Sequence, residues 1–359
     1  MRVLELYSGI GGMHYAFEKS GVPGTIVAAI EISTVANDVY KHNFPSTKLI
    51  NRNIGSLTVK DIEDLKIDSI FMSPPCQPFT RNGLQKDIKD ARTISFFHIL
   101  ELIPQLKNLK YILLENVEPF SKSVSRDILI SCLQNIGFNY RECILSPSDF
   151  GVPNSRSRYF LIAKKNDLPF CLSKYSSDIT ADLILEVFSK SQRFKVFKNK
   201  HPEYLTSDCI KLSEIVSNSN DIDTQEYNLP ESILNKYVKV LDIRSPDSKG
   251  SCCFTSAYGR YAEGTGSVFS PLLSSDVEEK IYELKNNEQL TNYSEIIKSL
   301  RLRYFTPSEV SRLMCFPDKF TFPSTISKRQ RYKLIGNSIN VHIVSLLIIL
   351  LDYVPDSNL

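Results

Sequence analysis

The sequence predicts an α/β fold in which a smaller, less regular domain is inserted into a larger one. Residues 2 to 165 alternate short β-like runs with helical patterns, and this alternation is typical of a doubly wound sheet. From about residue 166 the pattern weakens into Ser, Asn, Lys and Asp, and regular patterns return near residue 306. We therefore expect a first domain over 1–165, an insertion over 166–305 and a return to the first domain over 306–359.

The expected strands are short apolar runs, and the expected helices carry apolar residues at helical spacing. Strands are expected over 3–6, 25–30, 69–72, 111–114 and 158–163. Crossover helices are expected over 13–20, 35–43, 96–106 and 126–135, with Gly21 and Gly137 as stop signals. Further helices are expected over 306–315 and 339–350, and the second is so apolar that it should be buried against the first domain.

Composition restricts the class of protein. The chain has 359 residues, 42% hydrophobic and 23% charged, as in ordinary globular proteins. Its longest apolar run, 343–351, is too short to cross a bilayer, and the N-terminus lacks a signal-peptide layout. Eight cysteines without CxxC pairs argue against disulfides and zinc. We expect no metal, no membrane association, a monomer, and a cytoplasmic location with the nucleus as an alternative.

The most informative feature is a thiol on a proline-rich loop, Pro74-Pro75-Cys76-Gln77-Pro78-Phe79. A strand over 69–72 must end before Pro74, because proline lacks the N–H that a sheet ladder needs. Cys76 should then lie just beyond the carboxyl edge of the sheet, where ligands bind in α/β proteins. This position favours a nucleophile. The alternative is a buried, inert cysteine.

A glycine turn and an acidic residue predict a cofactor site at the same edge. Tyr7-Ser8-Gly9-Ile10-Gly11-Gly12 follows the first strand and precedes a helix, so backbone there can approach a ligand closely. The turn is not the dinucleotide fingerprint, whose third glycine would fall at Met13 or His14. Glu31 ends the second strand, where a carboxylate can accept hydrogen bonds from both ribose hydroxyls of a nucleoside. A helix-capping role is the alternative for Glu31.

An acid and two arginines complete the candidate catalytic set. Glu115 ends the strand over 111–114 and should stand on the same sheet edge as Cys76. In an apolar pocket its pKa would be raised, so that it could donate a hydrogen bond to a ring nitrogen. Arg156 and Arg158 alternate along the chain and would face one side of a strand. They could orient Glu115 or bind a carbonyl oxygen; the alternatives are a structural ion pair and a solvated edge strand.

Together these residues resemble the cytosine carbon-5 methyltransferases that use S-adenosylmethionine. The resemblance implies a Rossmann-like S-adenosylmethionine-dependent methyltransferase domain with an inserted smaller target-recognition domain. Six motifs stand in the family's order: the glycine turn, Glu31, Pro74-Pro75-Cys76-Gln77, Glu115-Asn116-Val117, Arg156-x-Arg158 and Gly336-Asn337-Ser338-Ile339.

The resemblance also implies a role for each catalytic residue. Cys76 would attack carbon 6 of cytosine, Glu115 would hydrogen-bond ring N3, the Pro74 carbonyl would receive the exocyclic amine, and Arg158, with Arg156 nearby, would hold the ring carbonyl. The methyl group would then pass to carbon 5, leaving S-adenosylhomocysteine, and elimination would free the thiol. The base must leave its stack to reach the thiol.

Further residues are expected in the cofactor and substrate sites. The cofactor set is the glycine turn together with Glu31, Ile32, Asn53, Ile54, Ser73, Pro75, Asn337 and Ser338. Asn53 stands where an aspartate usually contacts adenine, whereas Ile54 would still pack on the ring. The expected substrate set is Pro74, Gln77, Arg81, Cys253, Phe254, Thr255, Tyr258, Gly264 and Thr265.

One segment of the insertion narrows the substrate. Cys253-Phe254-Thr255-x-x-Tyr258-x-x-Tyr261-x-x-Gly264-Thr265-Gly266-Ser267 resembles the branch of the family that methylates transfer RNA. Its tyrosines could stack or hydrogen-bond in an RNA loop, and core packing is the alternative. We expect methylation of a cytosine in the anticodon loop of tRNA(Asp). A DNA cytosine methyltransferase is the second hypothesis, and a non-catalytic nucleic-acid-binding protein is the third.

Overall fold

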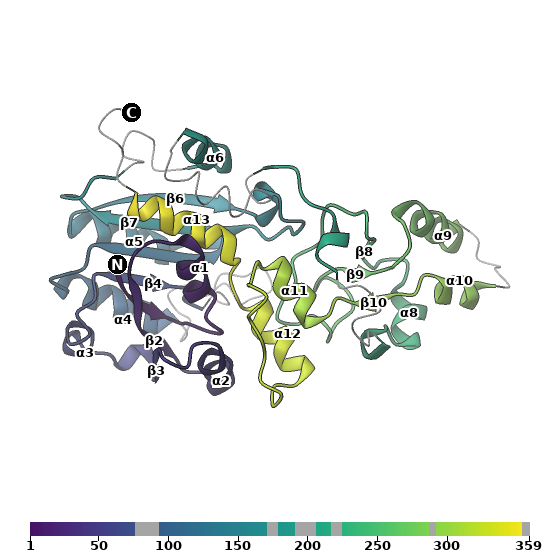
Figure 1. The fold of residues 1–359 in the computed structure, drawn as a ribbon, viewed down its shortest axis with the longest axis horizontal. Coiled ribbons are helices and arrows are strands. Elements are labelled where there is room, and N and C mark those ends of the chain that lie inside the picture. Colours follow the sequence, from purple (N-terminus) through teal and green to yellow (C-terminus); the bar gives the residue numbers. More distant parts are fainter. Residues whose placement is uncertain (76–92, 171–178, 191–205, 217–224, 287–291, 354–359) are drawn as a thin grey trace.

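In a computed structural model, the described residues are 1–75, 93–170, 179–190, 206–216, 225–286 and 292–353. They form two lobes (Figure 1). The large lobe is built on a seven-stranded sheet in the order β3-β2-β1-β4-β5-β7-β6. Its strands are β1 (Arg2–Leu6), β2 (Thr25–Glu31), β3 (Lys48–Asn51), β4 (Ser69–Met72), β5 (Tyr111–Val117), β6 (Phe138–Leu145) and β7 (Arg158–Lys165). The first five pair in parallel, and β7 runs antiparallel between β5 and β6.

Helices cover both faces of this sheet. One apolar cluster joins the sheet to α1 (Gly12–Ser20), α2 (Thr34–Asn43) and α13 (Val341–Asp352). The other joins it to α3 (Val59–Glu63), α4 (Ile94–Leu102) and α5 (Val124–Asn135). Short 3-10 helices lie at Ile54–Ser56, Ile103–Gln105, Glu118–Lys122, Pro147–Phe150, Leu212–Glu214 and Gln225–Tyr227. The predicted α/β fold is therefore confirmed.

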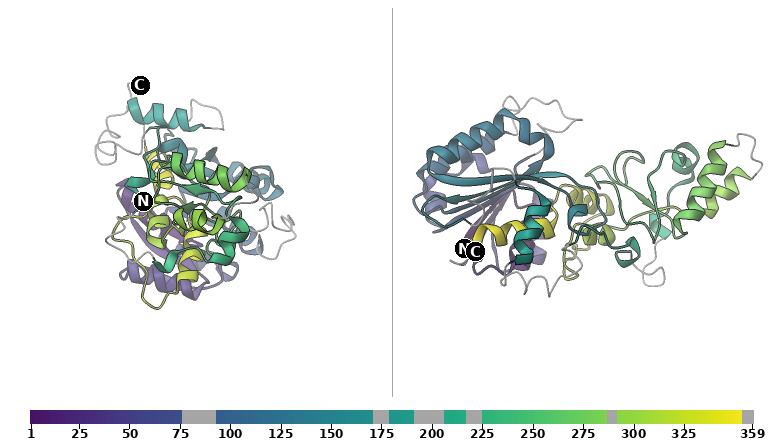
Figure 2. Two further views of the ribbon diagram at one scale, coloured as in Figure 1. Left: turned by 90° about the vertical axis from the view of Figure 1, so that its right-hand side faces the viewer. Right: turned by 90° about the horizontal axis from the view of Figure 1, so that it is seen from above.

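The small lobe is a separate body that extends from one end of the large one (Figures 1 and 2). It holds a three-stranded sheet in the order β10-β9-β8, made of β8 (Ile243–Arg244), β9 (Val268–Phe269) and β10 (Arg303–Tyr304). Three helices surround this sheet: α8 (Glu231–Tyr237), α9 (Ser274–Asn286) and α10 (Tyr293–Ser299). Helices α11 (Pro307–Leu313) and α12 (Lys328–Gly336) lie between the two lobes (Figure 1).

The apolar C-terminal helix is a core element. By length and composition the stretch Lys328–Asp352 could cross a membrane, with a mean hydropathy of 2.1 in its most apolar window, but 78% of that window is buried inside the protein. Within it, α13 spans 12 residues and packs against α1. The predicted burial of this helix against the first domain is confirmed.

Several elements of this arrangement were not predicted, among them two strands of the large sheet and helix α12. The strands β3 and β6 are the two edges of the large sheet, and their mixed burial lacks the continuous apolar run of the inner strands. Helix α12 has a strongly polar sequence, and its local signal is the capping box of Ser327 and Gln330. Predicted stops at Gly21 and Gly137 are present, both with positive φ.

The chain does not leave the large lobe at residue 166. The Ile179 N–H donates to the carbonyl of Glu142 in β6 at 2.9 Å. Helix α6 (Ala181–Lys190) follows, and Ile184 and Phe188 belong to the same apolar cluster as α1 and α13. The first part of the expected insertion therefore packs on the large sheet.

Candidate active site

The candidate site lies at the carboxyl ends of β1, β2, β4 and β5. These strands are neighbours in the parallel part of the sheet, and Met72 pairs with both Leu6 and Leu114. The loops that follow them therefore begin side by side. Pro74 is buried and Pro75 half-buried just beyond β4. Cys76, Gln77 and Arg81 were predicted to follow there; they lie outside the described residues.

The glycine turn after β1 is shaped by close packing. A Cβ at Gly11 would lie 2.4 Å from the Phe44 ring, and one at Gly12 would lie 2.7 Å from Ile339. Both positions therefore exclude side chains. Gly9 has a φ of 52°, and a Cβ there would meet no atom within 4 Å, so a ligand can approach the chain closely at this position. The contact of Gly12 with Ser338 and Ile339 also brings the Gly336-Asn337-Ser338-Ile339 motif to this turn.

Glu31 ties the glycine turn to the second strand. Its Oε2 accepts the Gly9 N–H at 3.1 Å, and its Oε1 accepts the N–H groups of Ile32 and Ser33 at 2.9 and 2.8 Å. The alternative that Glu31 caps a helix is thus partly right, because the N–H that it accepts from Ser33 belongs to the N-cap residue of α2. A carboxylate offers about four acceptor positions, so one remains for a ribose hydroxyl. To accept both ribose hydroxyls, Glu31 would have to release one of its hydrogen bonds from a backbone N–H group.

The remaining predicted cofactor residues differ in exposure and in the hydrogen bonds that they already form. Asn53 uses its side chain to cap the 3-10 helix that follows, accepting the Gly55 N–H at 2.9 Å. Ile54 is buried in the core, so it offers little surface to an adenine ring, whereas Ile32 is 64% exposed. Ser73 Oγ donates to the Tyr7 carbonyl at 3.3 Å, and the Tyr7 hydroxyl donates to Ser95.

Glu115 and Arg158 form the polar centre of the site. Glu115 is buried in β5, and Arg158 Nε lies 3.6 Å from its Oε1. Burial raises the pKa of Glu115 above its ordinary value, although Arg158 and Arg156 oppose the rise. A buried carboxyl with a raised pKa can hold a proton and donate it in a hydrogen bond. Next to it, the Asn116 amide donates to the Pro74 carbonyl at 3.3 Å and fixes the loop after β4.

Arg156 has a different role from the one predicted. It is only 4% exposed and lies before β7. Its Nη1 donates to the Phe254 carbonyl at 3.1 Å, and its Nη2 donates to the carbonyls of Gly336 and Ser338 at 3.1 and 2.5 Å. Its donors are thus directed at backbone from the small lobe and from the cofactor side. Arg156 is therefore a positioning residue that joins these parts.

Cys253 is the only predicted substrate residue of the small lobe whose side chain the structure places against the two arginines. Its Sγ accepts from Arg156 at 3.3 Å and from Arg158 at 3.8 Å. Burial alone would raise the pKa of this thiol, but the two guanidinium groups outweigh it, so the net shift is downward. A thiol with a lowered pKa therefore lies beside the predicted base site.

The predicted RNA contacts by Phe254 and Tyr258 are wrong for these side chains, which are 2% and 3% exposed. Their rings pack on each other and on Phe305 and Tyr332. The Tyr258 hydroxyl donates to the Ser267 carbonyl at 2.6 Å. The core-packing alternative is what the structure contains.

The glycines of this segment serve the same packing. A Cβ at Gly266 would lie 2.7 Å from both Phe254 and Tyr258, so only glycine allows the two rings to pack there. Thr265 is buried and bonds the Tyr261 carbonyl at 2.8 Å. Thr255 is half-buried, and Gly264 is exposed with a φ of 70°. The motif therefore shapes a compact loop.

A buried acid behind the glycine turn was missed. Glu5 in β1 is fully buried, and burial raises its pKa to about 8. Tyr40 donates to it at 2.8 Å, and His14 bonds the same hydroxyl at 2.8 Å. The available signal was an acidic residue inside the apolar run Val3-Leu4-Glu5-Leu6; its buried partners come from other elements.

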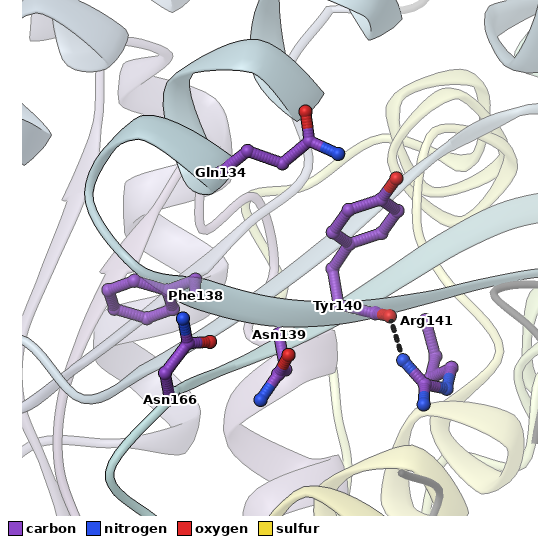
Figure 3. Close-up of a pocket in the computed structure, with 6 residues that line it drawn as sticks. All are labelled: Gln134, Phe138, Asn139, Tyr140, Arg141 and Asn166. Atoms are coloured by element: carbon purple, nitrogen blue, oxygen red, sulfur yellow. Dashed lines mark hydrogen bonds between the residues drawn. The ribbon is translucent and has the colours of Figure 1, made fainter. Parts of the chain in front are cut away.

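Two other features lie away from this site. A cavity of about 330 Å³ opens at the sheet edge beside β6 (Figure 3) and contains no predicted site residue; its lining is Gln134, Phe138, Asn139, Tyr140, Arg141 and Asn166. Among the described residues, no group of three or more His, Cys, Asp or Glu side chains could hold a metal ion.

Comparison with known proteins decides the family. The model of the family described as C-5 cytosine-specific DNA methylase matches residues 1–349. The chain belongs to this family. One relative of this chain is the tRNA (cytosine(38)-C(5))-methyltransferase of Spodoptera frugiperda. The two sequences are 45% identical, and the match covers 96% of this chain and 97% of the relative. Another relative is a DNA (cytosine-5)-methyltransferase of Dictyostelium discoideum. It is 38% identical, and the match covers 96% of this chain and 92% of the relative.

A solved structure agrees with this assignment. In the crystal structure of a Spodoptera frugiperda DNMT2 mutant, the sequence is 44% identical to this chain. The match covers 98% of this chain and 99% of that one, with a TM-score of 0.83. The methylase family implies the use of S-adenosylmethionine. The residues present fit that group, since a Cβ at Gly9 would meet no atom within 4 Å and Glu31 keeps an acceptor position at the end of β2.

Proposed function

We propose that this chain transfers a methyl group from S-adenosylmethionine to carbon 5 of a cytosine in tRNA, at position 38 of tRNA(Asp). The observation that carries the chemistry is the pair of buried Glu115 and half-buried Arg158, with the Pro74 carbonyl held by Asn116 next to Glu115 and with Cys76 two residues farther along the chain. The relatives named tRNA (cytosine(38)-C(5))-methyltransferase support the substrate.

The base is held by groups matched to its edge. The Pro74 carbonyl has one acceptor position beyond its bond with Asn116, which suits the exocyclic amine. Protonated Glu115 donates to ring N3, and Arg158 donates to the ring carbonyl. Drawing electron density toward N3 makes carbon 6 more electrophilic, so that thiolate attack becomes easier. The raised pKa of Glu115 supports this role, because only the neutral acid can donate.

The thiolate of Cys76 adds to carbon 6, and the electron pair of the ring double bond makes carbon 5 nucleophilic. The cofactor supplies an electrophilic methyl group on a positively charged sulfur. Once carbon 5 carries the methyl group, loss of its proton and expulsion of the Cys76 thiolate restore the aromatic ring. The carbon-5 proton leaves to water or a base and the thiolate is regenerated, so cytosine and S-adenosylmethionine would give 5-methylcytosine, S-adenosylhomocysteine and one proton, and no oxidant or reductant is needed.

The cofactor would bind along the glycine turn. Gly9 allows close approach of the backbone, and Glu31 accepts from the ribose. Ile32, largely exposed next to Glu31, can cover one face of the adenine. Asn337, Ser338 and Pro75 would close the far side. We further propose a monomer acting in the cytoplasm, with the nucleus as an alternative.

DNA cytosine methylation is the second candidate. It is favoured by the Dictyostelium relative, which is named a DNA (cytosine-5)-methyltransferase. The chemistry at the ring would be identical, so the distinction lies in the polymer. A target in an RNA loop is cheaper to extrude than a base in a duplex, because it is already unpaired.

A substrate comparison tests the proposal. The protein is incubated with labelled S-adenosylmethionine and either a total tRNA pool or duplex DNA, and the modified base is mapped by bisulfite sequencing. We expect label in tRNA, confined to one cytosine of tRNA(Asp). Label confined to DNA, or spread over many tRNA loops, would overturn the assignment.

A further inference from the structure

We propose that Arg260 and Tyr261 form a stacking platform for an unpaired base of the RNA loop that carries the target cytosine. This inference rests on the proposed function and adds a substrate-binding pair to it. The structure separates the two tyrosines of the family segment: Tyr258 is 3% exposed, whereas Tyr261 is 54% exposed. Tyr261 is therefore available to a ligand that Tyr258 cannot reach.

A cation accompanies the exposed ring. The Arg260 guanidinium carbon lies 5.0 Å from the centre of the Tyr261 ring. Arg260 is exposed and forms no ion pair with any residue that the structure describes. A tyrosine face beside an exposed guanidinium matches single-stranded RNA, in which bases stack on aromatic rings and phosphates attract arginine.

The platform is held in place by its own backbone. The N–H groups of Arg260 and Tyr261 both donate to the Ala257 carbonyl, at 3.0 and 3.3 Å. Thr265 Oγ1 donates to the Tyr261 carbonyl at 2.8 Å, and the Thr255 N–H closes the loop on the Thr265 carbonyl at 2.9 Å. A ring presented on a fixed loop loses little further freedom when a base stacks on it.

The loop also rests on the helix between the lobes. A Cβ at Gly259 would lie 3.0 Å from the Tyr332 ring of α12, and a Cβ at Gly336 would lie 2.3 Å from the Thr255 backbone. Loop and helix are therefore in direct contact. This rigid support fixes the direction in which the Tyr261 side chain leaves the protein surface.

The platform is within reach of the base site. Cys253, whose thiol contacts Arg156 and Arg158, begins the same segment. Tyr261 follows it by eight residues (261 minus 253), which limits their Cα separation to at most roughly 28 Å. The bridge between Tyr258 and Tyr261 folds the chain back and shortens that distance. One RNA loop can then contact both places.

The absence of tryptophan from the chain permits a direct optical test. Tyr261→Trp introduces a single tryptophan at the platform, which can be excited selectively over the tyrosines. A matched control is Tyr237→Trp on α8. The Lys236 ammonium lies 5.0 Å from the centre of the Tyr237 ring, but α8 packs against α10. On addition of an anticodon stem-loop RNA, we expect stacking to quench the fluorescence at 261 and to leave that at 237 unchanged. No change at 261 would overturn the proposal.

Affinity variants give the second measurement. For Tyr261→Ala we expect the dissociation constant for the stem-loop, measured by anisotropy, to rise about five- to 150-fold, since a stacked base is worth about that factor. Tyr261→Phe keeps the ring and should stay within twofold of the unmodified protein, and Arg260→Ala should weaken binding and reduce its salt dependence. Affinity of Tyr261→Ala within twofold of the unmodified protein, or a loss seen only with single-stranded DNA of the same sequence, would overturn the platform.

These readouts separate the two claims. Methylation of tRNA by the unmodified protein tests the proposed function, and binding by the Tyr261 variants tests the platform. Intact tRNA methylation with unchanged binding by Tyr261→Ala would overturn the platform alone. Loss of stem-loop binding in Tyr261→Ala, together with a protein that methylates only DNA, would overturn the proposed substrate while leaving the RNA-binding surface supported.

Discussion

At the carboxyl edge of the large sheet, Glu31 ends β2 and Glu115 lies two residues before the end of β5, and their carboxyl oxygens face the Gly9 N–H and the Arg158 guanidinium. In the small lobe, the motif residues Phe254 and Tyr258 turn inward and form the core. The two sets belong to one family pattern, yet the first lines the proposed site and the second packs a core. A motif therefore has to be interpreted together with the element that carries it.

The difference has a physical cause. Strands of the large sheet are covered by helices on both faces, so its core needs no help from the loops at the edge. The three strands of the small sheet have two residues each and cannot supply a core by themselves. Large aromatic rings from the neighbouring loop supply the missing apolar area. Arg156 then joins the two regions through carbonyls of Phe254, Gly336 and Ser338.

The largest effect is expected for Cys76→Ala. Because the thiol forms the bond to carbon 6, methyl transfer should fall below detection, whereas the dissociation constant for S-adenosylhomocysteine should change less than threefold. Methyl incorporation and calorimetry measure the two quantities. Cys252→Ala is the control, since Cys252 is an exposed thiol near the same site, and it should retain activity. Turnover by Cys76→Ala near the normal rate would exclude the covalent mechanism.

Glu115→Ala should lower kcat by about 10²–10³, the usual effect of removing one donor that stabilises developing charge. Burial raises the pKa of Glu115, so the acid stays protonated to higher pH than an exposed glutamate. The rate of the unmodified protein should fall as rising pH ionises Glu115. Glu115→Gln cannot ionise, so this fall should be missing from its kcat profile. An unchanged fall in the glutamine variant would assign it to another group.

Arg156→Lys tests the connection between the regions. A lysine cannot span acceptors from three segments as a guanidinium does, so kcat/KM should fall about ten- to a hundredfold, from the loss of one or two charge-assisted hydrogen bonds. In Arg156→Lys, the affinity for the cofactor should no longer differ between measurements made with and without RNA. Arg158→Lys is the control, because its partner is Glu115, and it should keep that dependence. A purely structural role for Arg156 would leave the dependence intact.

Glu5→Gln should change the pH dependence of stability. Burial raises the pKa of folded Glu5 to about 8, above its unfolded value of 4.5. The neutral acid therefore favours folding below pH 4.5, and this contribution is lost as pH rises through 8. The melting temperature of Glu5→Gln should rise relative to the unmodified protein over this range, by a difference worth a few kcal/mol at most, roughly 1.4 per pKa unit. Glu263→Gln, at an exposed position, should show no such trend.

The smallest kinetic effect is expected for Tyr258→Phe. The lost hydroxyl donates to the Ser267 carbonyl and accepts the Phe305 N–H at 2.9 Å, so stability should fall by about 1–3 kcal/mol. The KM for tRNA should stay within twofold, because this ring does not reach the surface. Denaturant unfolding and initial rates measure the two. A tenfold rise in KM with unchanged stability would make Tyr258 an RNA contact and remove the contrast between the lobes.

Local patterns were sufficient for the parts of the site that depend on strand ends. Glu31 and Glu115 follow apolar runs, and parallel pairing places such ends together. Glycines at 11 and 12 were predicted correctly as a turn, although their packing against Phe44 and Ile339 was not visible locally.

Long-range contacts account for what sequence patterns missed. The acceptors of Arg156 lie 97 to 182 residues away along the chain, and the Tyr40 partner of Glu5 lies 35 residues away. No periodicity records such pairings. The inward turn of Tyr258 was equally undetermined, because an aromatic residue with small neighbours is compatible with both core and surface.

The most direct test of the account is covalent trapping. An anticodon stem-loop RNA with 5-fluorocytosine at the target position is incubated with the protein and S-adenosylmethionine, and the trapped peptide is identified by mass spectrometry. Fluorine at carbon 5 blocks the final elimination, so we predict a stable one-to-one adduct on the peptide that carries Cys76. An adduct on Cys253, or an adduct formed with the matching duplex DNA and not with the RNA, would contradict the account.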